Sequence, residues 1–491
     1  MKANARLELP TFRGTMLWLV GLSLILGACG AWFLWGPLPA VGRAPLVLVL
    51  GPDESWQGIT PTQRIGLLLL LKDHLEIIHG QTVVEEPNLA GPPDIAASRV
   101  ILAGKRSGDA LSLEIRVIGA GAKEERWVTP MLPPRQSFES CLLQLRTKVD
   151  ADLPILPKAP AVFWDLADAT GYRIDQNPAV GIQQAKAVVA REPGCAGGWA
   201  SLAVLSYWEL YRETGANTTE SFYRCDALFR KAFALVPHYP RAVDDFAGFK
   251  TDVGNPREAL DVCFDALRKY PKVAHLHSAL AYPARISGLL EGASRALKAR
   301  DALVASHRFE RDTVENTHLY LGDWDYFERM LGPGSDTANE PSRDFYRGYI
   351  KLAKGRPDQA RPFFVRAQRV KGSWVQFETL SQVFEQALTD DRAGALKTLH
   401  QLKFARTRLR VPDGEFTFKL AEAFAFLGEH EEATETALRA YAQGFGCTRW
   451  YQESPFLAQV PRQARWNALL QHLKERQQLM EQTFPVSRFG R

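Results

Sequence analysis

The feature that most constrains the fold is a 34-residue repeat in the middle of the chain. Pro237 and Pro271 are 34 residues apart (271 − 237), and so are Ala232 and Ala266 (266 − 232). Gly254 falls between them, where a turn is expected. A fixed period of this length is typical of stacked helix-turn-helix units. Small residues let paired helices approach closely, and a proline ends a helix because it lacks an amide hydrogen.

Weaker matches extend the pattern in both directions. Trp199 begins the segment WASLA, and Gly288, Gly355 and Gly428 continue the series of turn glycines. With the prolines and alanines above, these residues resemble the tetratricopeptide (TPR) repeat, whose first helix carries a W-x2-L-G/A motif. The resemblance implies a TPR α-solenoid of about six to eight helix pairs over residues 157–443.

Length and composition set broader limits. A chain of 491 residues is too long for one core, so two or three units are expected. The 60 basic residues are interleaved with 55 acidic ones, and the resulting charge of +5 gives no large field for nucleic acid. The six cysteines include no CxxC pair, which argues against a zinc ribbon and a disulfide scaffold.

The N-terminal segment predicts a membrane anchor. Basic residues occur in residues 1–14, and residues 15–36 contain no charged side chain. About 20 apolar residues suffice to cross a bilayer as a helix, and the basic flank favours a cytoplasmic N-terminus. After a Pro/Gly-rich linker, residues 37–45, the bulk of the chain is expected outside the cytoplasm. This predicts a single-pass inner-membrane protein with a periplasmic body.

A lipoprotein is the alternative to this anchor. The segment Leu26-Gly27-Ala28-Cys29 resembles a bacterial lipobox, in which Cys29 is lipidated after the signal peptide is cleaved. The apolar run continues beyond Cys29 to Trp35, which favours an uncleaved transmembrane helix. Both alternatives place the body outside the cytoplasm.

Residues 46–150 predict a small α/β domain. The run LVLVL, residues 46–50, is a short buried strand, and Thr60 with Pro61 begins an amphipathic helix. A second strand is expected at 82–85, a hairpin within 99–121 and a helix at 138–149. These elements resemble the α/β domain beside TPR arrays in the extracytoplasmic parts of receptor-type Ser/Thr kinases and transmembrane transcription regulators. The expected fold class is therefore α with a small α/β domain.

Residues 444–480 predict a C-terminal cap. Aromatic and aliphatic residues here resemble the segment that closes TPR arrays in the same families. The last repeat has no successor, so its apolar face needs a cover that is polar outside. Trp450, Phe456, Trp466 and Leu469 are expected to cover it, with Lys474, Glu475 and Arg476 in water.

Sequence motifs give little support for catalysis or metal binding. The chain contains no G-x-S-x-G, phosphate-loop or HExxH motif. His74 and His79 share a helix face poorly, and His275 and His277 lie on different faces. Cys225 and Cys263 are expected to be buried in second helices, with a disulfide as the alternative in an oxidising compartment. No cofactor and no enzymatic activity are therefore expected.

The resemblance implies a concave groove lined by first helices. Its mixture of aromatic and charged groups suits an extended peptide or a partner's tail. The expected groove residues are Arg241, Asp244, His275, Tyr282, Arg285, Phe345, Tyr349 and Phe418. The function expected is a membrane-tethered scaffold that binds a membrane or periplasmic protein partner. Alternatives are a ligand-sensing subunit of a signalling complex, a lipoprotein assembly factor, and a hydrolase within the α/β unit.

Overall fold

The computed structural model describes most of the chain beyond residue 45. The described residues are 46–50, 59–80, 83–86, 99–107, 110–118, 124–149, 154–172, 178–211, 218–303, 316–331, 341–369, 376–411, 413–461 and 464–490. The predicted anchor, its linker and the lipobox cysteine Cys29 lie outside these residues. Within the described ranges, no helix is both long enough and apolar enough to cross a bilayer.

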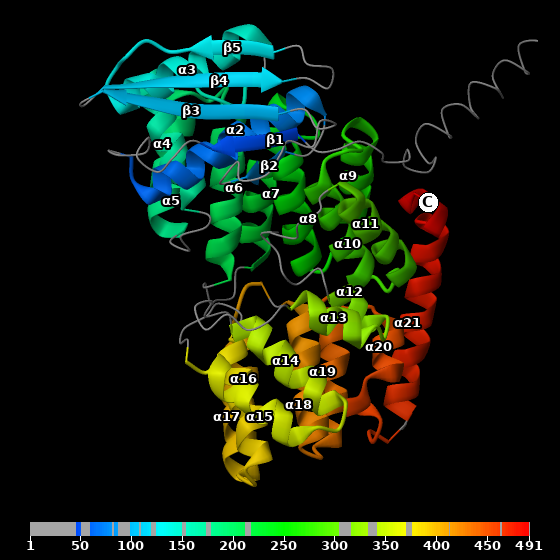
Figure 1. Cartoon of the computed structure of the whole chain (residues 1–491). Coiled ribbons are helices and arrows are strands. Elements are labelled where there is room, and N and C mark those ends of the chain that lie inside the picture. Colours follow the sequence, from blue (N-terminus) through cyan, green and yellow to red (C-terminus); the bar gives the residue numbers. More distant parts are fainter. Residues whose placement is uncertain are drawn as a thin grey trace, which may run out of the picture.

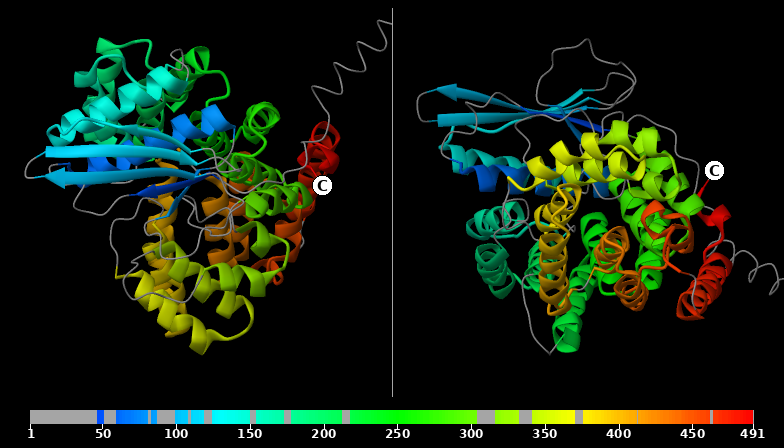
Figure 2. Two further views of the ribbon diagram at one scale, coloured as in Figure 1. Left: turned by 45° about the horizontal axis from the view of Figure 1, so that its top comes forward. Right: turned by 90° about the horizontal axis from the view of Figure 1, so that it is seen from below.

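A five-stranded sheet forms one end of the molecule (Figures 1 and 2). Its order is β2-β1-β3-β4-β5, with β1 parallel to both neighbours and the other pairs antiparallel. The strands are β1 (Leu46–Leu50), β2 (Val83–Glu86), β3 (Arg99–Ser107), β4 (Ala110–Ile118) and β5 (Glu124–Val128). The strand predicted at 46–50 and the hairpin within 99–121 are confirmed.

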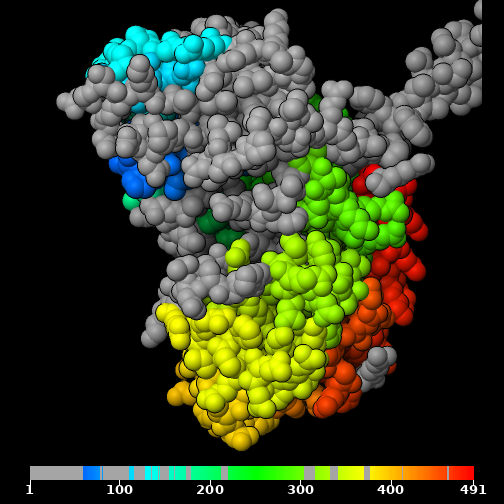
Figure 3. Space-filling view, viewed as in Figure 1, coloured from blue at the N-terminus to red at the C-terminus, as the bar shows by residue number. Residues whose placement is uncertain are grey.

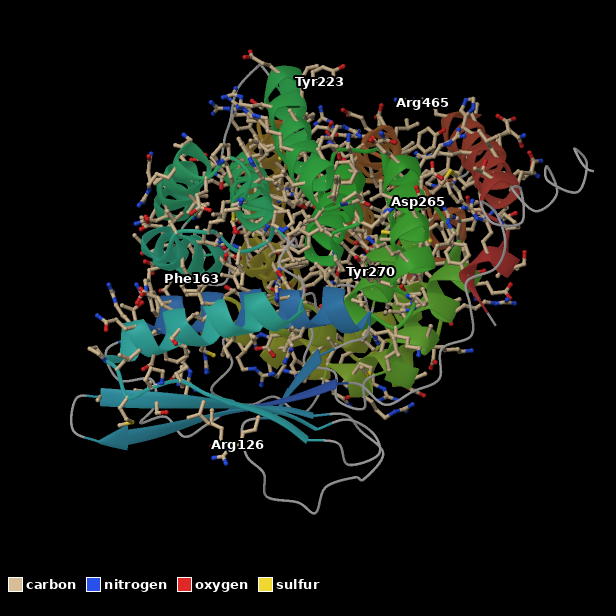
Figure 4. The ribbon with its side chains drawn as sticks, turned by 90° about the horizontal axis from the view of Figure 1, so that it is seen from above. Arg126, Phe163, Tyr223, Asp265, Tyr270 and Arg465 are labelled. Carbon is tan, nitrogen blue, oxygen red and sulfur yellow. The ribbon has the colours of Figure 1, made fainter. Side chains whose placement is uncertain are left out.

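Two helices cover the face of the sheet that is turned toward the rest of the molecule. These are α2 (Pro61–His79) and α3 (Pro134–Val149), with Leu111 and Leu113 of β4 buried beside Phe138 and Cys141 of α3. On the opposite face, Arg126 points away from the helices and pairs with Glu114 (Figure 4). The sheet is therefore packed on one side.

Helix α2 begins where the sequence predicts and joins the sheet to the helical body. Thr60 accepts a hydrogen bond from the amide of Gln63, and the Gln63 side chain accepts one from the amide of Thr60. At Gly66 and Gly171, α2 crosses α4 (Pro160–Gly171) at backbone contact. A Cβ on Gly66 would lie 1.7 Å from the carbonyl oxygen of Ala167. The sheet and the helices thus share one packed interface.

Antiparallel helix pairs make up the rest of the chain, in two lobes (Figure 1). The N-terminal lobe contains α4, α5 (Pro178–Arg191), α6 (Ala196–Leu210), α7 (Thr218–Leu235), α8 (Pro240–Asp252), α9 (Pro256–Lys269), α10 (Ala274–Ile286) and α11 (Leu290–Leu303). The C-terminal lobe contains α12 (Asn316–Tyr320), α13 (Trp324–Met330), α14 (Pro341–Ala353), α15 (Pro357–Ala367), α16 (Phe377–Leu388), α17 (Arg392–Thr407), α18 (Gly414–Phe426) and α19 (His430–Ala442). Helical pairing over the predicted repeat region is confirmed.

The turns inside the pairs follow the period found in the sequence. Gly254, Gly288, Gly322 and Gly355 all have positive φ, at 88°, 83°, 80° and 70°. Their spacings are 34, 34 and 33 residues (288 − 254, 322 − 288, 355 − 322). A left-handed residue after a helix is most easily supplied by glycine. Gly322 therefore places α12 and α13 in the same series, although the sequence around them is degenerate.

The two lobes adjoin one another (Figures 1 and 3), and turns of both lobes take part in the contact. A Cβ on Gly444 would lie 2.7 Å from the Cα of Gly254, and the amide of Gly446 donates to the carbonyl of Ile286 at 2.7 Å. Val411, before α18, is buried among residues of the N-terminal lobe. The array therefore closes on itself instead of staying an open superhelix.

A C-terminal strap, residues 464–490, crosses from one lobe to the other. It follows α20 (Thr448–Glu453) and the short helix η3 (Pro455–Leu457), and consists of α21 (Ala464–Thr483) and η4 (Val486–Phe489). Trp450, Phe456, Trp466 and Leu469, the residues expected to cover the last repeat, are all buried. Lys474 and Glu475 are exposed as expected, whereas Arg476 is half-buried and donates to the carbonyl of Gly444.

Phe489 anchors the end of the strap on the N-terminal lobe. Its ring lies 5.0 Å from that of Phe264 in α9 and fills the space beside Gly292 in α11. Phe484 stacks on the same Phe264 ring, with centroids 5.9 Å apart. The strap therefore reaches back to repeats that precede it by about 200 residues.

Candidate functional site at the lobe interface

The eight residues predicted to line an open groove are not open to a partner in this structure. Six are buried: Arg241, Asp244, Arg285, Phe345, Tyr349 and Phe418. His275 and Tyr282 are half-buried. The prediction that these residues lie on the inner face of the helices agrees with the structure, because their charged and hydroxyl-bearing side chains point toward the inside of the closed molecule. The expectation of an open groove was wrong, because the chain itself fills that space.

Helix α2 fills the end of the inner face nearest the sheet. Arg241 forms an ion pair with Asp73 of α2 at 2.6 Å, and the hydroxyl of Tyr239 donates to the same carboxylate at 2.7 Å. His275 Nδ1 lies 3.4 Å from Glu76, which is fully buried on α2. Two of the predicted groove residues thus contact carboxylates, but both carboxylates belong to the same chain.

The C-terminal lobe fills the other end of the inner face. Phe345, Tyr349 and Phe418 are part of an aromatic core, with Phe345 and Tyr349 centroids 5.7 Å apart. Arg285, at the end of α10, forms an ion pair with Glu415 of α18 at 2.7 Å. These residues hold the molecule together.

A set of polar side chains converges where the lobes meet, and we call it the lobe-interface cluster. It comprises Asp252, Arg285, Asn316, Arg406, Asp413 and Glu415 with the tyrosines Tyr207, Tyr211, Tyr282, Tyr320 and Tyr346. They come from α6, α8, α10, α12, α14, α17 and α18, together with residues that adjoin α6 and α18.

Asp252 ends α8 and is the centre of one half of the cluster. Its carboxylate accepts hydrogen bonds from the hydroxyls of Tyr207, Tyr211 and Tyr282. Burial, and then the negative charge of Asp252, raise the pKa of Tyr211 and Tyr282 well above the usual value, so both phenols keep their protons. They are therefore permanent donors to the carboxylate at physiological pH.

Asp413 faces Asp252 from the C-terminal lobe. It is the N-cap of α18, where its side chain accepts from the amide of Phe416 at 3.1 Å and its backbone has φ of 50°. Burial, followed by repulsion from Asp252, raises the pKa of Asp413 to about 7. Arg406 opposes this shift only partly, because its guanidinium lies 3.9 Å from the carboxylate. Asp413 therefore changes charge near neutral pH.

Glu415 organises the other half of the cluster. It accepts from Arg285, from the hydroxyl of Tyr320 and, at 3.2 Å, from the amide nitrogen of Asn316. Burial lowers the pKa of Arg285, but the charge of Glu415 and the phenols of Tyr320, Tyr282 and Tyr346 together outweigh burial and leave that pKa raised. Asn316 is 1% exposed and donates also to Tyr346 at 2.8 Å.

A second buried ion pair lies further along α18. Lys419 and Glu422, at most 1% exposed, are 2.9 Å apart. Glu422 also accepts from Tyr349, Trp450 and Ser454, and the Lys419 ammonium lies 4.3 Å from the centroid of the Tyr349 ring. Every partner is supplied by the chain, so this pair is structural.

The histidines and cysteines form no metal site in the described part of the chain. His275 and His277 point to different elements, as predicted, and burial lowers the pKa of His277 to about 4. Cys225 and Cys263 are buried and are not joined by a disulfide, which agrees with the expected packing role. Burial raises the pKa of Cys141 to about 12, so its thiol is unreactive.

Several residues of the cluster were not identified from the sequence. Asp252, Asn316, Asp413 and Glu415 are not among the eight residues predicted to line the groove. The available signal was the unusual number of charged residues at inner positions of α18, such as Glu415, Lys419 and Glu422. No protein-family model matches the chain, and a search of curated proteins finds no significant match.

Proposed function

We propose that the protein is a non-enzymatic sensor that binds a small polar ligand at the lobe-interface cluster. One observation carries this proposal: charged and hydroxyl groups from both lobes converge on an interior that lies between them. Small-molecule sites are concentrated at such interfaces, with a few convergent polar groups that orient the ligand. Groups with strongly shifted pKa values, such as Asp413, are also concentrated at functional sites.

The closed arrangement of the lobes supports sensing over catalysis. A ligand shifts a conformational equilibrium only by its difference in affinity between two states. A ligand that contacts Asp252 of one lobe and Glu415 of the other favours the closed state, because separating the lobes removes half of its contacts. The cluster presents acceptors, phenols and guanidiniums but no nucleophile activated by a base.

The remaining parts of the proposal come from the sequence. The period of the turns supports TPR-type repeats, and the sheet with α2 and α3 supports an α/β unit attached to them. The apolar run at 15–36 supports a membrane anchor with an extracytoplasmic body. In this arrangement α2 connects the sheet, which follows the anchor, to α8 and α10, through Asp73 and Glu76.

Equilibrium dialysis against a cell extract tests the sensor. The full chain and its Asn316→Ala variant are dialysed side by side, and retained small molecules are identified by mass spectrometry. We expect at least one compound to be enriched by the wild-type protein and lost in the variant. Identical retention by two folded proteins would reject the cluster as the ligand site.

A protein-binding scaffold is the second candidate, and the contact between α2 and the array favours it. Arg241 and His275 contact carboxylates of α2, and this supports an inner face suited to an acidic helix. A partner helix with two acidic residues one turn apart would compete with α2. Photocrosslinkers at His275 and Tyr282, with exposed Lys474 as control, test this. Capture of a single protein from the inner positions supports the scaffold, and equal capture from all three positions rejects it.

A further inference from the structure

Residues 484–490 contact the N-terminal lobe as a short linear segment. The side chains of Phe484, Arg488 and Phe489 surround the ring of Phe264 in α9, which is 1% exposed. Phe484 stacks on that ring at 5.9 Å, Phe489 meets it edge-on at 5.0 Å, and the guanidinium of Arg488 lies 4.3 Å from its centroid. Aromatic and arginine side chains that converge on one pocket are the typical anchors of protein-binding sites.

Helices α9 and α11 supply the pocket, and the strap end, marked C in Figure 1, lies beside them. Gly292 of α11 leaves room for the Phe489 ring, because a Cβ on Gly292 would lie 2.7 Å from a ring carbon. Glycine destabilises a helix interior relative to alanine, and the ring accounts for its presence here. Arg295 of α11 donates to the carbonyl of Gly490 at 3.1 Å. The pocket therefore holds both a side chain and the backbone of the segment.

Carboxylates of α9 favour a basic residue in the segment. Burial lowers the pKa of Arg488, whereas the charges of Asp261 and Asp265 raise it against the like charge of Arg268. Burial raises the pKa of Asp261, and the charge of Arg488 acts to lower it, so these two groups face each other. A segment with arginine or lysine at this position fits the pocket, and one with an acidic residue does not.

The chain's own segment satisfies the pocket only in part. The Nε atom of Arg488 is buried and has no hydrogen-bond partner, although Nη1 donates to the carbonyl of Thr483 at 3.1 Å. A buried donor without an acceptor is costly. Helix α21 is also held on the C-terminal lobe through Trp466 and Leu473, so residues 484–490 can leave the pocket while α21 stays in place.

We propose that the pocket of α9 and α11 is a docking site for a linear segment of a partner protein, and that residues 484–490 occupy it in the partner's absence. The partner segment has two aromatic residues five positions apart (489 − 484 = 5) and a basic residue directly before the second. This surface goes beyond the proposed sensor, since the lobe-interface cluster draws no residue from α9 or α11.

A second copy of this chain is not the expected partner. Its segment is identical in sequence, so it has no advantage in affinity over residues 484–490 of the first copy. The tethered segment is present at a high effective concentration, which an identical segment on another molecule does not match. The partner therefore carries a segment that fits the pocket better than the chain's own.

Peptide binding to the full chain tests the docking site. The probe is a fluorescein-labelled peptide of residues 484–490 (FPVSRFG) with an amidated end, and fluorescence anisotropy measures its dissociation constant. Phe489→Ala vacates the ring position in the chain, and we expect this variant to bind the peptide at least about tenfold more tightly than the wild type, whose own segment competes. Within the peptide, Arg488→Glu and Phe489→Ala are each expected to weaken binding about tenfold.

Gly292→Ala in the Phe489→Ala background is the matched control. The added methyl group occupies space that the ring has vacated, so it supports the fold and excludes the aromatic residue of the peptide. We expect this second substitution to abolish the gain in peptide binding. Absence of binding to a folded Phe489→Ala chain, or binding that Gly292→Ala leaves unchanged, would overturn the docking site.

Hydrogen exchange of the wild-type chain provides a second measurement, which requires no variant. The amides of Phe484 and Arg488 donate to the carbonyls of Met480 and Pro485. We expect excess peptide to speed the exchange of these amides about threefold or more, because it displaces the segment. Unchanged exchange would overturn the proposal. Self-association of the wild-type chain that Gly292→Ala abolishes would also overturn it, since the partner would then be a second copy.

Discussion

Lys419 and Glu422 illustrate how single residues stabilise this fold. Both are fully buried, and each has several partners: the ammonium contacts aromatic rings, and the carboxylate accepts from Tyr349, Trp450 and Ser454. Taking two charges out of water costs several kcal/mol for each ion, which good geometry only just recovers. Loss of either charge is therefore more damaging than loss of both.

Glu422→Ala is expected to lower the free energy of unfolding by about 3–5 kcal/mol, because it leaves the Lys419 ammonium buried without a counter-ion. Denaturation by urea measures the loss. The double variant Lys419→Met/Glu422→Leu should recover part of it. Glu435→Ala is the control, since Glu435 is exposed on α19 and should change stability by less than about 0.5 kcal/mol. Equal losses in Glu422→Ala and Glu435→Ala would contradict this account.

Asp413 is expected to make stability fall as pH rises from about 4 to 7. Its pKa is about 7 in the folded chain and about 3.9 when unfolded, so between these values the folded state holds a proton that the unfolded state has lost. The full penalty, at most about 4 kcal/mol, applies above pH 7. Asp413→Asn keeps the N-cap acceptor and should remove this slope. Urea midpoints of both proteins at pH 5 and pH 8 provide the measurement; parallel pH profiles would exclude Asp413 as the source.

At the scale of elements, the crossing of α2 and α4 fixes the sheet on the helical body. Gly66 and Gly171 permit contact between the two backbones, and any side chain at either position meets a carbonyl group. Glycine is also favoured in the turns, because their backbone has positive φ. The turns could therefore be predicted from the positions of glycines, whereas the residues around them could not. Gly254 and Gly288 could be recognised from spacing, whereas Asp390 adopts a left-handed turn with φ of 60° and carries no such mark.

Gly66→Ala should destabilise the protein by about 2 kcal/mol. Alanine gains about 1 kcal/mol in a helix interior, but the overlap with the carbonyl of Ala167 costs up to about 3 kcal/mol in backbone displacement. Gly194→Ala is the control, because nothing lies within 4 Å of a Cβ there. Hydrogen exchange should show the loss in α2 and α4 first. A neutral effect at Gly66 would mean that the crossing relaxes easily.

At the scale of the whole molecule, the sequence predicts which residues face inward but not that the helical array closes on itself. Helix periodicity correctly assigned Arg285 and Tyr282 to the inner face. It could not show that Arg285 meets Glu415, since these residues are 130 positions apart and no local pattern links them. The prediction of an open groove was wrong for the same reason. Whether an array with few repeats is open or closed depends on contacts between its ends.

Phe489→Ala tests how much the C-terminal strap contributes to closure. Loss of a buried phenylalanine from its place between α9 and α11 is expected to cost about 3–5 kcal/mol. Leu479→Ala is the control on the same strap, because Leu479 is 55% exposed. Limited proteolysis should cut the Phe489 variant near α21 first. Equal resistance of both variants to proteolysis would show that the strap does not stabilise the closed arrangement of the lobes.

The hydrogen bond between Gly446 and Ile286 has an evolutionary consequence. In an open array each repeat contacts only its neighbours, so a duplication or deletion of one repeat changes the length and little else. Here the backbone bond and the approach of Gly444 to Gly254 require a set number of helix pairs between them. Gain or loss of a single pair would displace these partners, so the protein has exchanged the modular growth of repeat arrays for a fixed repeat number.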